Sequence, residues 1–500
     1  MLLMKFNKNK KKSVNKKAFI KTLLILFCFS LIYLSICFSN AFIKNSDYNL
    51  IYKKFQEDNF FRKENINCDK YDPIFLMAER LKKNPIILCN SKDSKHICYQ
   101  NSKYALYNKI TLYKYGVICK SENFILDPSK SFFSNYIYKG PIDKINLGAP
   151  ILSKGFFNIK CETNEKLKKY HRIYKNYFQS WEYNVSKDDE QFEMKIPELA
   201  SGKTIFFLSR NQDSPNLFHG ISEFINAISI LYLFKLNPEN IQIVFLESMK
   251  FNNDPFLFLY KNIISRGGEP LYIRDLKQKY HITNAFHIPI NWDSPSFIRS
   301  ILPKENYDCK YSTQTYNILN NLLNKYLNIP NFKDSFISDE NSFYYPDSVV
   351  KNSNITNISI TIQWRKVWPR GRSNQQRILG NGPELTEKLA SILPKNFLIR
   401  LVDTASLSII EQISIMRKTN YLIGVHGAGL SLSIFMPPNS VLYEILPKHN
   451  IKSLLIMSGL SGHKVYSDII KSEKKVINNN DVYFFDSNEF IKNVLKIIRN

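Results

Sequence analysis

Two short apolar stretches dominate the C-terminal half of this sequence. Residues Tyr421–Leu430 read YLIGVHGAGL, and residues Val441–Leu446 read VLYEIL. The first has the pattern of a buried strand that runs into glycines, and the second carries a carboxylate, Glu444, near its end. Because glycine has no side chain, the backbone N–H groups at Gly427 and Gly429 can approach a diphosphate closely where a helix begins. This layout predicts a nucleotide pocket.

The order of the glycines distinguishes this pocket from a dinucleotide-binding loop. A nicotinamide-binding domain carries G-x-G-x-x-G directly after its first strand. Here the order from Gly424 to Gly429 is G-x-x-G-x-G, and it comes late in the chain. The glycine order therefore argues against a nicotinamide-dependent enzyme.

Apolar runs of strand length alternate with helical spacing on both sides of this stretch. In the second half, strands are expected at 358–364, 397–402, 421–425 and 441–446, with helices at 384–393 and 407–417. In the first half, the expected elements are a strand at 204–208, a helix at 218–234 and a strand at 241–246. This alternation predicts an α/β fold whose second half is doubly wound. A last amphipathic helix at 490–499 is expected to pack back across the other domain.

The N-terminus has the features of a membrane anchor. Residues 22–39 are eighteen residues without a charge, and the apolar run extends to Ile43. Seven lysines and no acid precede it within residues 1–17, which places this short end in the cytosol and predicts type II topology. A cleavable signal peptide remains the alternative interpretation, since a basic start and an apolar stretch are common to both.

The net charge of +26 does not indicate a nucleic-acid-binding protein. Eight lysines lie within the first 21 residues, and the remaining charge is spread thinly along a chain rich in lysine and asparagine. A solvated lysine-rich surface explains this distribution, and no DNA- or RNA-binding motif accompanies it. We therefore expect no nucleic-acid partner.

The cysteines indicate a compartment in which disulfides persist. Two of the eight lie in the apolar run, and the six beyond it are Cys68, Cys89, Cys98, Cys119, Cys161 and Cys309. Their even number and their concentration before residue 162 suggest that they cross-link the N-terminal region, although their connectivity cannot be deduced. No C-x-x-C pair occurs, so we expect no zinc site. Sequons at Asn184, Asn354 and Asn357 are compatible with a lumenal chain.

Several of these motifs together resemble one family. The run His426–Leu430, the sequence FMPP at 435–438, Glu444 and the sequence EQI at 411–413 are similar to the C-terminal signature of glycosyltransferase family 61. The resemblance covers about residues 355–447 and reappears at Asn216–Phe224. This family includes core xylosyltransferases of plant N-glycans and N-acetylglucosaminyltransferases that act on extracellular protein domains. Two α/β domains facing a cleft would resemble the two-Rossmann, GT-B architecture of many sugar transferases, here expected to follow an N-terminal transmembrane helix and stem.

The donor is expected to bind in the second half. A UDP-sugar needs charge neutralisation at its diphosphate, because the leaving group gains negative charge as the glycosidic bond breaks. A helix N-terminus and converging arginines supply it without a metal, so we expect neither cofactor nor metal. His426 would donate to a phosphate or sugar, or orient the glycine loop, and Glu444 would accept from the ribose hydroxyls or be a buried paired acid. The expected donor-binding residues are Arg365, Arg372, Asn381, His426, Gly427, Ala428, Gly429, Leu430 and Glu444.

The acceptor side is expected in the first half. Asn216–Phe224 resembles the family pattern Asn-x-x-His-x-x-x-Asp, with Glu223 in place of the aspartate. His219 and Glu223 are four residues apart and therefore share one face of a helix. An inverting transferase needs one general base for the acceptor hydroxyl, so His219 oriented by Glu223, or Glu223 itself, is the expected catalytic group.

The resulting expectation is an inverting glycosyltransferase of the Golgi or endoplasmic reticulum membrane. It would move xylose or N-acetylglucosamine from a UDP-sugar to a glycan or glycoprotein acceptor. The alternative is a catalytically inactive, membrane-tethered relative that binds a sugar nucleotide or glycan. The expected organisation is a cytosolic tail at 1–17, an anchor at 18–43, a stem at 44–75, an acceptor-side domain at 76–345 and a nucleotide-sugar-binding domain at 346–500.

Overall fold

The computed structural model describes residues of the compact unit Phe61–Asn500. The described residues include Asp72 and Ile74 and, with short gaps, the ranges 86–132, 151–161, 180–184, 196–208, 216–246, 256–288, 313–327, 342–344, 358–364, 377–446 and 453–499. The expected tail and anchor lie outside them. None of the described helices is long and apolar enough to cross a membrane.

A nine-stranded sheet forms from the first half of the described chain. Its parallel part contains the expected strands, with β10 at Thr204–Leu208 and β11 at Ile241–Phe245. Their neighbours in the parallel part are β12 (Leu271–Tyr272) and β13 (Tyr280–Ile288). The sequence analysis proposed no elements for the remaining part of the sheet. From β13 it continues antiparallel through β5 (Ile118–Leu126), β2 (Lys95–Tyr99) and β1 (Ile86–Asn90). β8 (Phe157–Lys160) pairs antiparallel with β5 and parallel with β9 (Trp181–Asn184).

The helix α5 (Leu217–Leu233) connects β10 to β11, close to the predicted bounds. It begins after Asn216, whose side-chain oxygen accepts a hydrogen bond from the backbone N–H of Phe218 at 3.1 Å, as expected of an N-cap residue. Gly220 allows the helix to approach Phe256, because a Cβ at position 220 would lie 2.1 Å from that ring. α6 (Leu257–Leu259) and the π-helical turn η7 (Tyr260–Ile264) then lead to β12.

Two disulfides cross-link the first sheet. Cys89 is bonded to Cys161, and Cys98 is bonded to Cys119 across the β2–β5 pair. The expectation that cysteines cross-link the N-terminal region is confirmed for these four residues. Cys68 and Cys309 lie outside the described residues.

A six-stranded sheet forms from the second half, in the order β14-β17-β15-β18-β19-β20. All of its strands are parallel except β14, and the four predicted strands are confirmed within a residue. Its strands are β14 (Ser342–Tyr344), β15 (Ile358–Gln363), β17 (Phe397–Val402), β18 (Tyr421–Val425), β19 (Val441–Ile445) and β20 (Lys464–Asp468). β14 belongs to this sheet although it lies before residue 346, where the domain boundary was expected.

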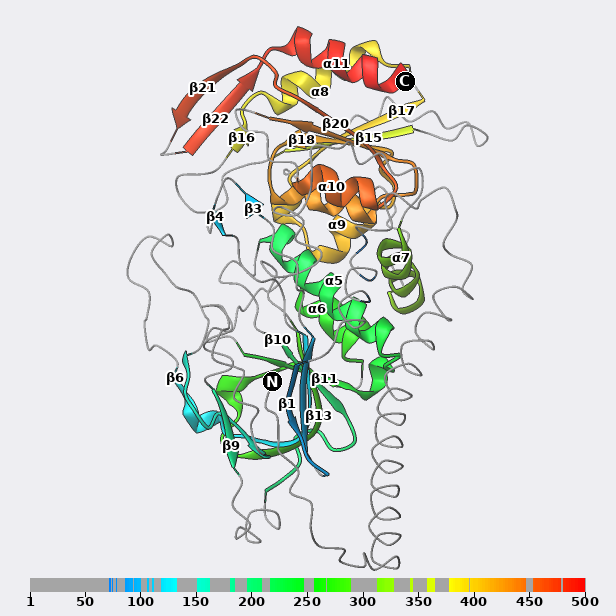
Figure 1. The fold of residues 1–500 in the computed structure, drawn as a ribbon. Coiled ribbons are helices and arrows are strands. Elements are labelled where there is room, and N and C mark those ends of the chain that lie inside the picture. Colours follow the sequence, from blue (N-terminus) through cyan, green and yellow to red (C-terminus); the bar gives the residue numbers. More distant parts are fainter. Residues whose placement is uncertain are drawn as a thin grey trace, which may run out of the picture. The chain divides into compact units, whose positions relative to one another are not determined.

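Helices cover both faces of this sheet (Figure 1). α8 (Gly382–Ile392) and α11 (Ser487–Arg499) share one hydrophobic core with the strands. α9 (Ile409–Met416), α10 (Ser453–Leu460) and the 3-10 helix η14 (Ala428–Phe435) form the opposite layer. The expectation that the C-terminal helix packs across the other domain is wrong, because α11 buries its apolar face against α8 and the second sheet. A small sheet of β16 (Arg377–Leu379), β22 (Asn480–Phe485) and β21 (Ser472–Ile477) completes this half.

Helices also join the elements of the two sheets. α5 contacts η14, and α7 (Gln314–Tyr326) contacts α5. The backbone N–H of Thr313 donates to Leu460 O at 2.9 Å, which connects the start of α7 to the end of α10. Asp72 is fully buried at the same end of α7 and accepts hydrogen bonds from the backbone N–H of Thr315 at 2.8 Å and from its hydroxyl at 2.7 Å. Asp72, near the end of the segment expected to be a stem, is therefore part of the folded unit.

Candidate functional site

The strand order of the second sheet creates a topological switch point. β15 comes first in the chain, β17 pairs on one side of it, and the chain then returns across β15 to form β18 on the other side. Connections therefore diverge at the carboxyl ends of β15 and β18, which is where ligands bind in open α/β sheets. Gln363 ends β15, and His426 directly follows β18.

His426 and Glu444 are brought together at this edge. The backbone N–H of His426 donates to Ile445 O at 2.9 Å, which holds the end of β18 against β19. The His426 ring contacts Glu444 Oε1 through Nδ1. Glu444 has no exposed surface, and its Oε2 has no hydrogen-bond partner among the residues that the structure describes. A buried carboxylate that accepts from Nδ1–H selects the tautomer in which Nε2 can accept a proton or a hydrogen bond.

A helix begins directly after His426, as predicted, although it is a 3-10 helix. Gly427 precedes its first residue, Ala428. The first N–H groups of a helix have no partner within it, so this end attracts anions. Leu430 differs from the expectation, because its N–H donates to Gly427 O at 3.0 Å and its side chain is fully buried. Leu430 is therefore a core residue that supports the turn, and the N–H groups before it form the candidate anion site.

Gly429 has a packing partner that the sequence analysis did not identify. A Cβ at position 429 would lie 1.9 Å from Nε2 of Gln363, so the Gln363 side chain packs directly against this glycine. The same Nε2 donates to Thr404 Oγ1 at 2.7 Å. Thr404 follows the end of β17, and both polar side chains are buried. The available sequence signal was a glutamine at the end of a strand whose other residues are isoleucine, serine and threonine.

Asn381 occupies a different environment from the one expected of a donor ligand. It precedes α8, and its amide exchanges two hydrogen bonds with the backbone of Phe485 in β22. Nδ2 donates to Phe485 O at 2.9 Å, and Oδ1 accepts from Phe485 N at 3.1 Å. This pair connects α8 to the small sheet, and any contact of Asn381 with a donor stays a prediction.

The basic loop lies outside the described residues. This loop includes Arg365 and Arg372, the two arginines expected at the phosphates. Its point of departure is described, because Trp364 follows β15 and its N–H donates to Val402 O at 2.8 Å. Residues 365–376 therefore follow a strand that ends at the switch point.

His219 and Glu223 lie in the first two turns of α5. His219 is partly exposed, whereas Glu223 is 2% exposed. Because α5 contacts η14, the helix that carries the expected acid–base pair meets the helix that follows His426 and Gly427. Their catalytic role stays a prediction.

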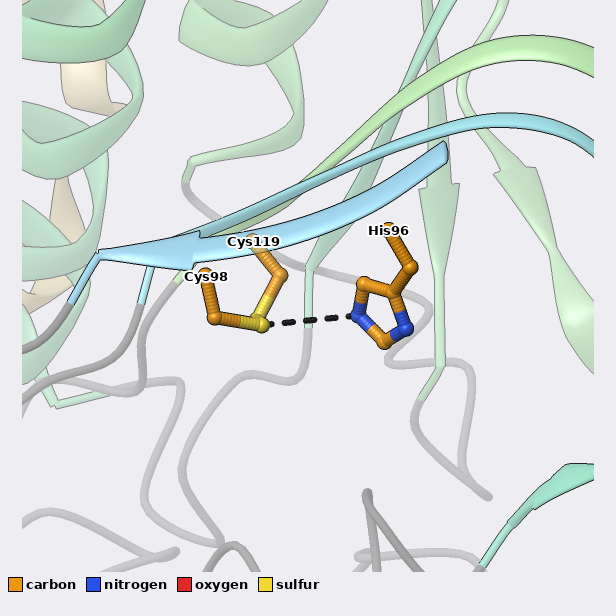
Figure 2. A group of neighbouring side chains, drawn as sticks. All are labelled: His96, Cys98 and Cys119. Atoms are coloured by element: carbon orange, nitrogen blue, oxygen red, sulfur yellow. Dashed lines mark hydrogen bonds between the residues drawn. A yellow bond between two sulfur atoms is a disulfide. The ribbon is translucent and has the colours of Figure 1, made fainter. Parts of the chain in front are cut away.

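A separate cluster in the first sheet contains His96, Cys98 and Cys119 (Figure 2). Their potential ligand atoms lie within 4.8 Å of one another, and His96 Nε2 is 3.4 Å from Cys98 Sγ. Burial lowers the pKa of His96 to about 3, so the ring is neutral. The two sulfurs are bonded to each other and provide no thiolate, so in this oxidised state the cluster belongs to the core.

The fold and the switch-point residues define an α/β protein with a candidate anion-binding edge. Residues 290–443 match the family model Glycosyltransferase 61. The match assigns this part of the chain to that family and the protein to the enzymes of glycosyl transfer. It includes Gln363, Asn381 and the turn from His426 to Leu430, and it ends one residue before Glu444. No match to the chain was found among curated proteins.

Proposed function

We propose that this protein is an inverting glycosyltransferase that transfers xylose or N-acetylglucosamine from a UDP-sugar to a hydroxyl of a glycan or glycoprotein. The observation that carries this proposal is the contact between His426 and the buried Glu444 at the switch point, next to a helix N-terminus. Glu444 Oε2, unpartnered among the described residues, is available to a hydroxyl such as those of the ribose. The helix N-terminus would receive the diphosphate.

In this proposal the two sheets correspond to the two Rossmann-like domains of a GT-B enzyme. The second would hold the donor, with Arg365 and Arg372 at the phosphates. The first would present the acceptor, with His219 or Glu223 taking the proton of its hydroxyl as that oxygen attacks the anomeric carbon. The contact between α5 and η14 supports this assignment, because it brings the two groups of residues to neighbouring elements.

We further propose that the protein is a single-pass type II membrane protein of the Golgi or endoplasmic reticulum, with its folded unit in the lumen. The charge-free segment at 22–39 and the lysines before it support this topology. The two disulfides are compatible with an oxidising compartment. Accessibility of an N-terminal tag and of the folded unit to protease in sealed microsomes tests the topology, and a protected tag with a digested folded unit would contradict it.

A panel of UDP-sugars tests the proposed donor. A ligand that binds only the native state raises its melting temperature, so one UDP-sugar is expected to stabilise the folded unit and then to release UDP in the presence of acceptor. His426→Ala is expected to abolish donor binding, with His281→Ala, a partly exposed histidine on β13, as the control. Undiminished UDP affinity in His426→Ala would refute the pocket. UDP binding without sugar transfer or hydrolysis would instead identify an inactive relative.

A further inference from the structure

Gln363 occupies a central position at the switch point. It is the last residue of β15, and its backbone is in register with Val402 of β17 and with Gly424 of β18. Only 7% of its surface is exposed. A polar side chain at the carboxyl end of a central parallel strand therefore lies between the segments that leave the sheet on either side.

The Gln363 side chain contacts both of those segments. On one side its Nε2 donates to Thr404 Oγ1 at 2.7 Å, directly after β17. On the other side it fills the space that a Cβ at Gly429 would need, at 1.9 Å for Nε2 and 2.7 Å for Cδ. Its own Cβ lies 3.2 Å from the position of a Cβ at Gly424. The side chain thus fixes the separation between the turn after β18 and the end of β17.

We propose that Gln363 is a positioning residue that holds the Gly427–Gly429 turn so that its N–H groups meet the diphosphate of the donor. The inference rests on the proposed function, because it concerns how the backbone N–H groups of the proposed donor site are held in position. Backbone donors stabilise a developing negative charge only when they are preorganised. A buried amide with a hydrogen bond to Thr404 provides that order, since its own rotamer is held by its partner and its neighbours.

The first sheet contains a matched arrangement that serves as a control. Gln242 on β11 is 5% exposed, and its Nε2 donates to Glu269 O at 2.7 Å. A Cβ at Gly268 would lie 2.7 Å from Gln242 Oε1. The same pairing of a buried glutamine with a glycine therefore exists on the other sheet, outside the candidate donor site. Gln242 Nε2 also donates to Ile243 O at 3.0 Å, so Gln242→Ala removes at least as much hydrogen bonding as Gln363→Ala does.

The test compares Gln363→Ala with Gln242→Ala in the folded unit, with UDP affinity and melting temperature as the two readouts. Both variants are expected to melt earlier. Gln363→Ala is expected to weaken UDP binding about five- to tenfold, because the turn loses the order that the buried hydrogen bond to Thr404 imposes. Gln242→Ala is expected to leave UDP affinity within about twofold of wild type. Equal UDP affinities in the two variants would overturn the inference.

A double-mutant cycle separates positioning from packing. Gly429→Ala alone is expected to lower the melting temperature and abolish UDP binding, because the new methyl group meets the Gln363 amide. Adding Gln363→Ala removes the clash, so the double variant should regain the melting temperature and the weakened UDP affinity of Gln363→Ala, without reaching the wild-type affinity. Wild-type UDP affinity in the double variant would also overturn the inference.

The conservative variant Gln363→Met keeps the length of the side chain but removes the hydrogen bond to Thr404. It is expected to restore the melting temperature more fully than the UDP affinity, and equal restoration of both would assign Gln363 a packing role alone. Failure of the wild-type protein to bind UDP or any UDP-sugar overturns the proposed function. Normal wild-type binding with unchanged affinity in Gln363→Ala overturns only the positioning role.

Discussion

The imidazole of His426 meets the carboxylate of Glu444 through Nδ1, and the two residues come from neighbouring parallel strands whose register pairs Gly424 with Glu444. Glu444 is fully buried, whereas the His426 side chain is 12% exposed. The Glu444 carboxyl group therefore lies in the protein interior, and the His426 ring lies at the edge of the sheet where the ligand is expected. Burying a carboxylate costs solvation free energy, so we expect Glu444 to have a role in binding.

We expect Glu444→Gln to separate stability from binding. The amide keeps the shape of the carboxylate and can still accept from His426 Nδ1–H, while the cost of burying a charge disappears. The melting temperature should therefore remain or rise, and UDP affinity should fall about tenfold, because a neutral amide binds a donor hydroxyl less strongly than a carboxylate does. Calorimetric titration with UDP measures the change. Glu473→Gln, on the exposed strand β21, is the control, and equal affinities in both variants would contradict the role of Glu444.

We expect Asp72→Ala to destabilise the folded unit by about 2–3 kcal/mol. The change leaves the buried N–H and hydroxyl of Thr315 without their acceptor, and it removes the acid from the N-terminus of α7. Denaturant unfolding followed by tryptophan fluorescence measures the loss. Asp486→Ala, which removes an exposed acceptor at the start of α11, should cost only about 1 kcal/mol. An equal effect of both substitutions would show that burial at Asp72 is unimportant.

We expect stability to fall as the pH is lowered from 7 to 5. Burial lowers the pKa of His96 to about 3 and that of His463 to about 4, whereas an unfolded histidine titrates near 6.5. The unfolded chain therefore binds more protons over this range, which costs the native state up to about 2 kcal/mol for each histidine at pH 5. The variant His463→Gln should show a smaller loss between the two pH values in denaturant unfolding. Parallel pH profiles for the variant and the wild type would contradict this explanation.

We expect sugar transfer to continue in EDTA. No Asp-x-Asp sequence is convincingly placed after a strand, and the helix N-terminus with the arginines of the basic loop would neutralise the diphosphate. UDP release with and without chelator measures the effect, with a manganese-dependent transferase as the positive control for chelation. Loss of activity that Mn²⁺ restores would contradict the expectation.

The sequence predicted the second sheet closely because its signals are local. An apolar run at 421–425 followed by glycines needed no tertiary information to be recognised as a strand that leads into a helix. The strands between residues 76 and 195 were not predicted, because β1, β2 and β5 pair antiparallel and their short apolar runs carry no decisive period. The hydrogen bonds of Asn381 were not predicted either, since their partner, Phe485, is distant in sequence.

By itself the sequence determined the α/β class, the family, and the strand that delivers His426 and the glycines to the ligand edge. Only the tertiary structure decided which side chain packs against Gly429 and contacts its turn. The reason is that hydrophobic period and glycine spacing act within about ten residues, whereas the contacts of Gln363 with Thr404 and Gly429 span 41 residues or more. Such contacts exist only when three parallel strands are in register, and register is a property of the whole sheet.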